Sequence, residues 1–225
     1  MPTPDAFSGF KPEAVQFLRD LAAHNDRAWF QPRKGDYERL LKEPMEELCV
    51  VLSGAFDRRD LPLDADPRRS PFRIYRDIRF SKDKSPYKTW VSASFPWSGE
   101  GRGVGGYFSL SGEGSYVGGG CWHPDAPRLA AWRRLVDDDP EAVHAALDEP
   151  GFTAAFGSVD RDSLKRVPPG YPSDHPEADL LKLKDVTFGR NLSPAEVTSP
   201  ELPARIADAL VASLPVLRLL TSLED

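Results

Sequence analysis

The chain has 225 residues and a mass of 25.0 kDa, which suits one large domain or two small ones. Its hydrophobic share of 40% and charged share of 28% are ordinary for a globular protein and exclude global disorder. The net charge of −6 argues against a general nucleic-acid or anionic-membrane binder, although it leaves room for a local basic patch. Two cysteines exclude both a disulfide framework and a four-cysteine zinc site. The 22 prolines predict short elements joined by ordered loops.

The motifs that the chain lacks narrow its location and chemistry. Met1–Asp5 has neither the basic nor the apolar region of a signal peptide, and no apolar run reaches the length of a membrane span. We therefore expect a cytoplasmic protein without a membrane partner. The absence of HExxH, GxSxG and GxxxxGK[ST] excludes the commonest zinc-protease, α/β-hydrolase and P-loop enzymes.

Residues 10–58 have a helical pattern. Pro12 suits the first turn of a helix whose apolar face includes Leu18 and Leu21, and Asp26 suits the cap of a short turn that follows. A second helical region continues to about Phe56, and Pro44 should kink or restart it.

Residues 71–122 change to a period of two, which predicts an antiparallel β-meander. The first strand should place one charge, Arg76, in an otherwise apolar row that runs from Phe72 to Phe80. Glycine-rich turns separate the later strands, which we expect at about 88–97, 107–111 and 115–122.

The C-terminal half returns to helices. Residues 125–157 predict helices capped by Asp125 and Asp139, and residues 165–190 predict an extended loop with a possible last strand near 181–188. A leucine-rich stripe over 199–221 predicts one closing helix despite Pro215. No repeat or long linker divides residues 1–225, so the fold class is α+β, a single domain with the meander packed against N- and C-terminal helices.

Positive charge is concentrated in one segment. Residues 68–90 hold eight basic and two acidic side chains, a local balance of +6, so the rest of the chain sums to −12. Arginine binds carboxylate or phosphate in a bidentate manner and lysine adds point charge, which favours a site for a small anion. The net charge of −12 on the rest of the chain argues against a nucleic-acid partner. The residues expected to contact the ligand are Arg73, Arg76, Arg79, Lys84, Tyr87 and Lys88.

Arg76 has two interpretations. Because an unpaired charge in an apolar row is costly, it either pairs with a buried carboxylate from a helix or meets an anion in a pocket. Strand alternation places Arg73 and Arg79 on the opposite face, so these residues cannot all serve one small ligand. Arg68, Arg69 and Lys82 are typical of a solvated loop.

The eighteen residues Phe72–Thr89 resemble the signature of the bacterial and fungal proteins grouped as domain-of-unknown-function family 2461. Other stretches resemble that family in the same order along the chain: Asn25–Phe30, Gly118–Trp122, Lys165–Tyr171, Asp174–Pro176 and Asp179–Lys182. The resemblance implies membership without an assigned reaction.

Several further patterns suggest chemistry. Gly101–Gly106 fits GxGxxG, but a strand pattern follows it, which favours a hairpin connection over a dinucleotide site. Cys121, His123, Asp125 and His175 match no standard zinc spacing, so neither a metal nor another cofactor is expected.

Three functional hypotheses follow. The favoured one is a pocket for a small anionic ligand, for example a phosphorylated one. The second is a hydrolase or transferase in which Asp174 and His175, or His123, act near the basic strand, since imidazole titrates near neutrality. The third is a non-catalytic module for a protein or nucleic-acid partner, in which Tyr75, Tyr87, Trp90 and Trp97 could stack on bases.

Overall fold

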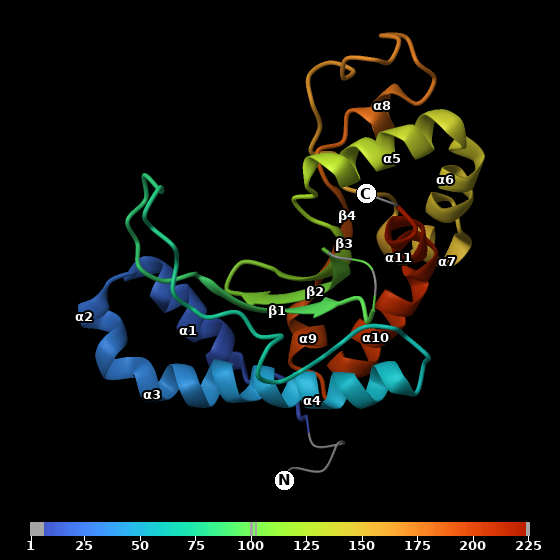
Figure 1. Ribbon diagram of the computed structural model, residues 1–225. Helices are drawn as coiled ribbons and strands as arrows, with labels where there is room; N and C mark the ends of the chain where they lie inside the picture. Colours follow the sequence, from blue (N-terminus) through green and yellow to red (C-terminus); the bar gives the residue numbers. More distant parts are fainter. Residues whose placement is uncertain (1–6, 100, 102, 224–225) are drawn as a thin grey trace. The chain divides into compact units, whose positions relative to one another are not determined.

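A computed structural model describes residues 7–99, 101 and 103–223 (Figure 1). The N-terminal third is helical, as predicted. Its elements are α1 (Pro12–Ala23), α2 (Arg27–Phe30), a 3₁₀ turn η1 (Gln31–Arg33), α3 (Lys34–Tyr37), a π-helical turn η2 (Glu38–Lys42) and α4 (Glu43–Asp57).

Local signals set these helix boundaries. Pro12 begins α1, and the Asp26 carboxylate accepts a hydrogen bond from the Trp29 amide at 2.8 Å, which caps α2. Pro44 lies in the first turn of α4, directly after the π-helical turn. The backbone is helical on both sides of this junction, and Pro44 has no amide hydrogen to donate, so the regular α-helical bonding is interrupted there.

The sheet has four antiparallel strands in the order β1 (Trp90–Pro96), β2 (Val104–Ser111), β3 (Ser115–Cys121) and β4 (Val186–Leu192). The α+β class is therefore confirmed. One detail of the predicted meander is wrong, because residues 71–80 form no regular strand. The last strand lies at 186–192 and overlaps the possible strand predicted near 181–188.

Residues 71–90 form an irregular hairpin, which we call the basic hairpin. Isolated bridges pair Pro71 with Ala93 and Tyr75 with Tyr87, and the Phe72 amide donates to the Ser92 carbonyl at 2.8 Å. The predicted apolar row is not a core row. Ile74 is buried, but 46% of Phe72 and 95% of Phe80 are exposed, because the hairpin leaves the edge of β1 and extends away from the helices of its unit (Figure 1).

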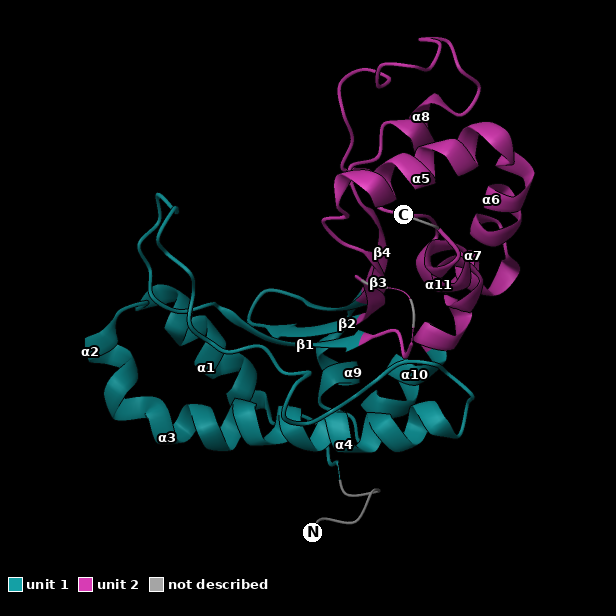
Figure 2. Cartoon of the chain, in the orientation of Figure 1, with its two compact units in different colours: residues 1–95, 107–117, 191–208 teal, residues 96–106, 118–190, 209–225 magenta. Residues whose placement is uncertain are grey.

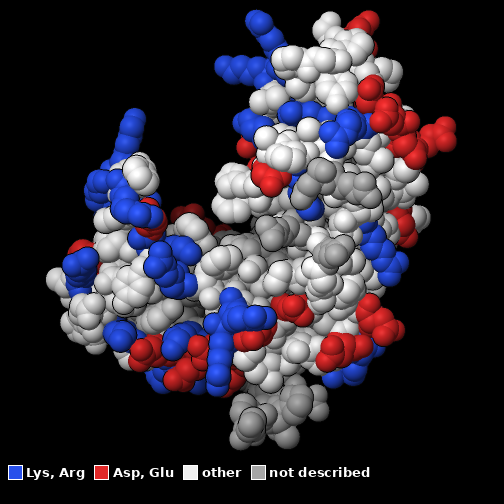
Figure 3. Space-filling model, viewed as in Figure 1, with Lys and Arg blue, Asp and Glu red and all other residues white. Residues whose placement is uncertain are grey.

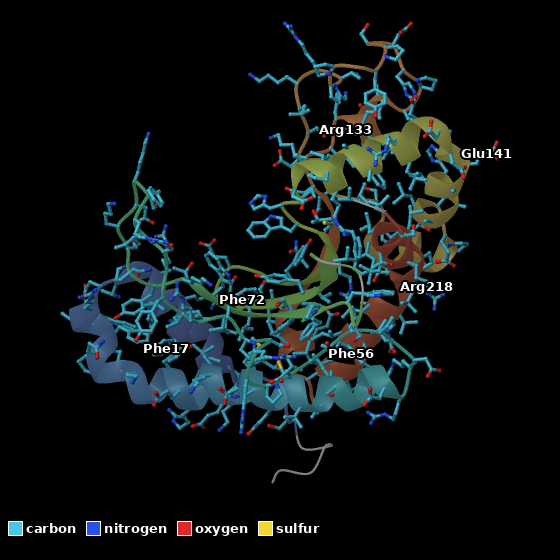
Figure 4. The ribbon with its side chains drawn as sticks, viewed as in Figure 1. Phe17, Phe56, Phe72, Arg133, Glu141 and Arg218 are labelled. Atoms are coloured by element: carbon cyan, nitrogen blue, oxygen red, sulfur yellow. The ribbon has the colours of Figure 1, made fainter. Side chains whose placement is uncertain are left out.

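The chain forms two compact units (Figure 2). Whether they make up one domain, as the sequence predicts, is not tested by this division. Unit 1 comprises residues 1–95, 107–117 and 191–208, within the described range. In its core, Phe56 of α4 packs edge-on against Phe95 of β1 with ring centroids 5.5 Å apart (Figure 4). Phe10 stacks on Phe108 of β2 at 6.0 Å. All four rings are buried.

Unit 2 comprises residues 96–106, 118–190 and 209–225, within the described range, and includes α5 (Ala126–Asp138), α6 (Pro140–Leu147), α7 (Pro150–Phe156) and α8 (Ala178–Leu181). Asp125 caps α5 and Asp139 caps α6, as predicted. Trp132 of α5 is 1% exposed, and its indole nitrogen donates to the Leu180 carbonyl at 3.1 Å. This bond fixes α5 against α8.

The predicted closing helix is interrupted. It forms α10 (Leu202–Ala212) and α11 (Leu214–Thr221), preceded by the short α9 (Pro194–Val197) with a capping box between Ser193 and Glu196. Pro215 has no amide hydrogen for a continuous helix, and the Ser213 hydroxyl donates to the Leu210 carbonyl at 2.7 Å at the break. Among the described residues, no helix is both long and apolar enough to cross a bilayer.

Candidate functional site

A pocket of about 190 Å³ lies within unit 1, between the helical segment 37–46 and the chain that leads into the basic hairpin. Its basic side chains are Lys42, Arg68 and Arg73, and Glu46 is the acidic one. Pockets for drug-sized molecules measure roughly 300–1,000 Å³, so this pocket suits a small group. The remaining lining residues are Tyr37, Leu41, Met45, Pro67, Pro71, Phe72, Val91 and Ser92.

A turn built on Asp66 positions Arg68. The Asp66 carboxylate accepts hydrogen bonds from the amides of Arg68 at 2.7 Å and Arg69 at 3.2 Å, and these bonds lower its pKa below the usual range. The Arg69 guanidinium lies 3.3 Å from the same carboxylate. By contrast, the Arg68 guanidinium has no ion pair or hydrogen bond among the described residues. Backbone bonding thus fixes the turn and leaves the Arg68 charge available.

The start of the basic hairpin positions Arg73. Its neighbour Phe72 is bonded to β1, and the Ile74 carbonyl accepts from the Lys88 amide at 2.8 Å. Backbone bonds therefore flank Arg73 on both sides. Within the described residues, its guanidinium also has no ion pair or hydrogen bond. Two guanidinium groups with free donors on one small pocket favour an anion site.

The helical wall of the pocket contributes Tyr37 and Lys42. Burial raises the pKa of Tyr37 to about 12, helped by the neighbouring Tyr75 and Glu46, so its hydroxyl stays a neutral donor at physiological pH. Lys42 ends the π-helical turn and lies 3.7 Å from Glu46. π-helical turns are rare, and those that occur are often found at functional sites.

Three of the predicted ligand residues are used inside the basic hairpin. Arg76 bonds the Asp83 carboxylate and donates to the Ser85 carbonyl at 3.3 Å. Its partner carboxylate thus comes from the same hairpin, not from a helix. Arg79 pairs with Asp77 at 2.7 Å, and the Lys84 ammonium donates to the Ile78 carbonyl at 2.9 Å. These bonds organise the hairpin, and none of the three residues lines the pocket.

The other two predicted ligand residues serve packing. Tyr87 is 1% exposed and stacks on Phe30 with ring centroids 4.1 Å apart. The Lys88 ammonium lies 5.1 Å from the centroid of the Phe72 ring, and burial, together with Arg73, lowers its pKa. Of the six predicted residues, the pocket therefore includes Arg73. The sequence missed Tyr37 and Lys42, and it assigned Arg68 to a solvated loop.

The candidate general bases lie in unit 2. His175 accepts a hydrogen bond at Nδ1 from the Glu177 amide at 3.0 Å, so its Nε2 carries the proton that faces Asp137 at 3.0 Å. Both ring nitrogens are thus engaged, which favours a structural role. His123 stacks on Trp122 at 3.9 Å, and its amide donates to Asp185 at 2.6 Å. The hydrolase or transferase that joins Asp174 and His175 to the basic strand stays a prediction.

The described residues offer neither a metal-binding cluster nor a reactive cysteine. No group of three or more His, Cys, Asp or Glu side chains is placed there to hold a metal ion. Cys49 and Cys121 are free and buried, and burial raises the pKa of both thiols, that of Cys49 to about 12. The strand β2 begins at Val104, inside the GxGxxG segment 101–106, and continues to Ser111. The segment therefore leads into a strand and not into the helix of a dinucleotide site, although Arg102 lies outside the described residues.

These features define an α+β protein with a cationic pocket beside the edge of an antiparallel sheet. Residues 13–218 match the family described as conserved hypothetical protein (DUF2461), and the chain belongs to that family. The resemblance of Phe72–Thr89 and the other stretches is therefore confirmed. No curated protein and no solved structure matches the chain.

Proposed function

We propose that the pocket between residues 37–46 and 67–73 binds a small anion, such as the phosphate group of a metabolite. The observation that supports this proposal is the pair of guanidinium groups, Arg68 and Arg73, that line the pocket without an ion pair or hydrogen bond among the described residues. Every other arginine of the basic hairpin has a carboxylate partner.

The electrostatics of the pocket suit an anion. Three basic side chains line the pocket, Lys42, Arg68 and Arg73, and only one carboxylate does. That carboxylate, Glu46, lies beside Lys42. Arginine forms bidentate bonds with phosphate or carboxylate, and the Tyr37 hydroxyl adds a neutral donor. No histidine is among the lining residues, which favours binding over acid–base chemistry.

Thermal unfolding with inorganic phosphate, pyrophosphate and citrate tests the proposal. A ligand that binds the folded state at 100 times its Kd stabilises it by about 2.7 kcal/mol. For a chain of this size, that corresponds to a rise in Tm of about 5–11 °C. Arg68→Ala and Arg73→Ala should reduce the rise, because each removes a bidentate donor.

Arg69→Ala is the matched control. Arg69 follows Arg68 directly but faces Asp66 and does not line the pocket, so the variant should keep the response to the anion. The proposal is wrong if no anion raises Tm in the parent, or if all three variants respond as the parent does.

A further inference from the structure

The exposed aromatic side chains coincide with the basic segment. Six large hydrophobic side chains are exposed among the described residues, and four of them lie between residues 72 and 90: Phe72, Tyr75, Phe80 and Trp90. The other two, Trp122 and Leu164, belong to unit 2. A cluster of exposed apolar groups on a folded protein marks an interaction surface. Figure 3 shows Lys and Arg side chains gathered over the same hairpin.

We propose that the basic hairpin, residues 71–90, binds single-stranded nucleic acid. Such sites combine cations that follow the phosphate backbone with aromatic rings on which successive bases stack. The hairpin offers both within one segment. This inference goes beyond the small-anion pocket, with which the hairpin shares Phe72 and Arg73, and it does not require the pocket to bind an anion.

Internal bonds pair both acidic side chains of the hairpin with its own arginines. Asp77 pairs with Arg79, and Asp83 pairs with Arg76 and accepts from the Ser85 hydroxyl at 2.6 Å. These bonds lower the pKa of both carboxyls to about 2, so they stay ionised and bonded. The cations that remain for phosphates are Arg73, Lys82, Lys84 and Lys88, of which Lys84 donates one bond to a carbonyl and Lys88 lies over Phe72.

The positions of the aromatic rings favour a strand over a membrane surface. A membrane contact needs its apolar groups at one depth. Here Phe72 bonds β1 at the base of the hairpin (Figure 4), Tyr75 pairs with Tyr87 farther along, and Phe80 lies beyond that pair toward the turn. The eight residue steps from Phe72 to Phe80 span at most about 26 Å, the length of an extended chain at roughly 3.3 Å per residue. That length matches about eight stacked nucleotides at about 3.4 Å each.

The negative charge on the rest of the chain does not prevent this binding. Salt screens exposed charges beyond about 8 Å at physiological ionic strength, so a short strand on the hairpin experiences the local positive field. The total charge of −6 therefore disfavours a long polyanion that covers the whole protein, not a short one on the hairpin.

Fluorescence anisotropy with a labelled oligo-dT or oligo-U of about 12 nucleotides tests this proposal in the full chain. Phe80→Ala should weaken binding about 5-fold or more, and Phe80→Tyr should restore it, because the ring stacks and the hydroxyl does not interfere. Since 95% of Phe80 is exposed, neither variant should alter Tm. Trp122→Ala, which removes an exposed ring from unit 2, is the control and should bind as the parent does.

Charge is tested separately. Lys82→Ala should make the slope of log K against log[salt] shallower by about 0.7, the contribution of one phosphate contact in a single strand. Lys165→Ala, at an exposed position of unit 2, should leave the slope unchanged.

Two competitors identify the partner. Heparin, which has charge but no bases, should bind more weakly than the oligonucleotide, and its binding should not depend on Phe80. Vesicles that contain anionic lipid should not bind. Equal binding of heparin, binding of vesicles alone, or no binding of the oligonucleotide overturns the proposal. Loss of the phosphate response in Arg68→Ala with oligonucleotide binding intact would separate the two functions.

Discussion

Replacement of Tyr87 distinguishes a ligand-binding role from a packing role. The sequence predicted that its hydroxyl would donate to an anion, but its ring stacks on Phe30 at 4.1 Å and is 1% exposed. The Asn25 side chain also holds its backbone, accepting from the Tyr87 amide at 3.1 Å and donating to the Tyr87 carbonyl at 2.9 Å. Tyr87 therefore anchors the returning arm of the basic hairpin to the N-terminal helices.

The magnitude follows from this burial. Truncation of a buried aromatic side chain to alanine costs about 3–5 kcal/mol, so we expect Tyr87→Ala to lower Tm by about 6–20 °C. Tyr87→Phe keeps the ring, and the hydroxyl has no hydrogen-bond partner among the described residues, so this variant should cost less than about 1.5 kcal/mol.

Urea unfolding followed by circular dichroism measures both variants. Tyr87→Ala should lower the midpoint without a change in the m value, which reports lost stability of the same folded state. The packing role is refuted if Tyr87→Ala unfolds as the parent does. It is also refuted if Tyr87→Phe has a normal midpoint but loses stabilisation by phosphate, because the hydroxyl would then be a ligand donor.

Three further variants or reactions test the fold. Gly120→Ala should lower the free energy of unfolding by about 2–5 kcal/mol, because φ is +119° and the added Cβ would lie 2.1 Å from the Val186 carbonyl oxygen. The control in the same urea unfolding assay is Gly114→Ala, whose added Cβ would meet no atom within 4 Å. The His144 Nε2–H donates to the Glu177 carboxylate at 3.0 Å, which raises the pKa of His144. Protonated His144 therefore stabilises the fold below its unfolded pKa of about 6.5, and this contribution is lost as pH rises through the higher folded pKa. His144→Gln should therefore lower Tm at about pH 5.5 and leave it unchanged at about pH 8.5, and an equal loss at both values would contradict the ion pair. Burial keeps the Cys49 and Cys121 thiols protonated, so iodoacetamide should label neither until urea unfolds the chain, and rapid labelling of the native protein, read by mass spectrometry, would contradict their burial.

Local sequence signals predicted much of the secondary structure. Pro12, Asp26, Asp125 and Asp139 begin or cap helices where expected, because capping and proline geometry depend on a few neighbouring residues. The period-two segments that became β1, β2 and β3 were also found, and the resemblance of Phe72–Thr89 identified the family.

The same local signals failed where long-range pairing decides the outcome. Residues 71–80 alternate like a strand, yet Phe72 and Phe80 are exposed, because the segment leaves the edge of β1 as a hairpin. β4 joins the sheet from residues 186–192, a pairing that no nearby residue encodes. The leucine stripe predicted one closing helix, but the helix is interrupted next to Pro215 and forms α10 and α11.

For the candidate site, the sequence determined that residues 68–90 concentrate positive charge, since a charge count needs no structure. The tertiary structure decided which of those charges are available. Arg76 and Arg79 find carboxylates within the hairpin, whereas Arg68 and Arg73 line a pocket with Tyr37 and Lys42, residues about thirty positions earlier in the chain. Side-chain pairing and pocket walls depend on distances between segments remote in sequence, and the folded chain alone sets those distances.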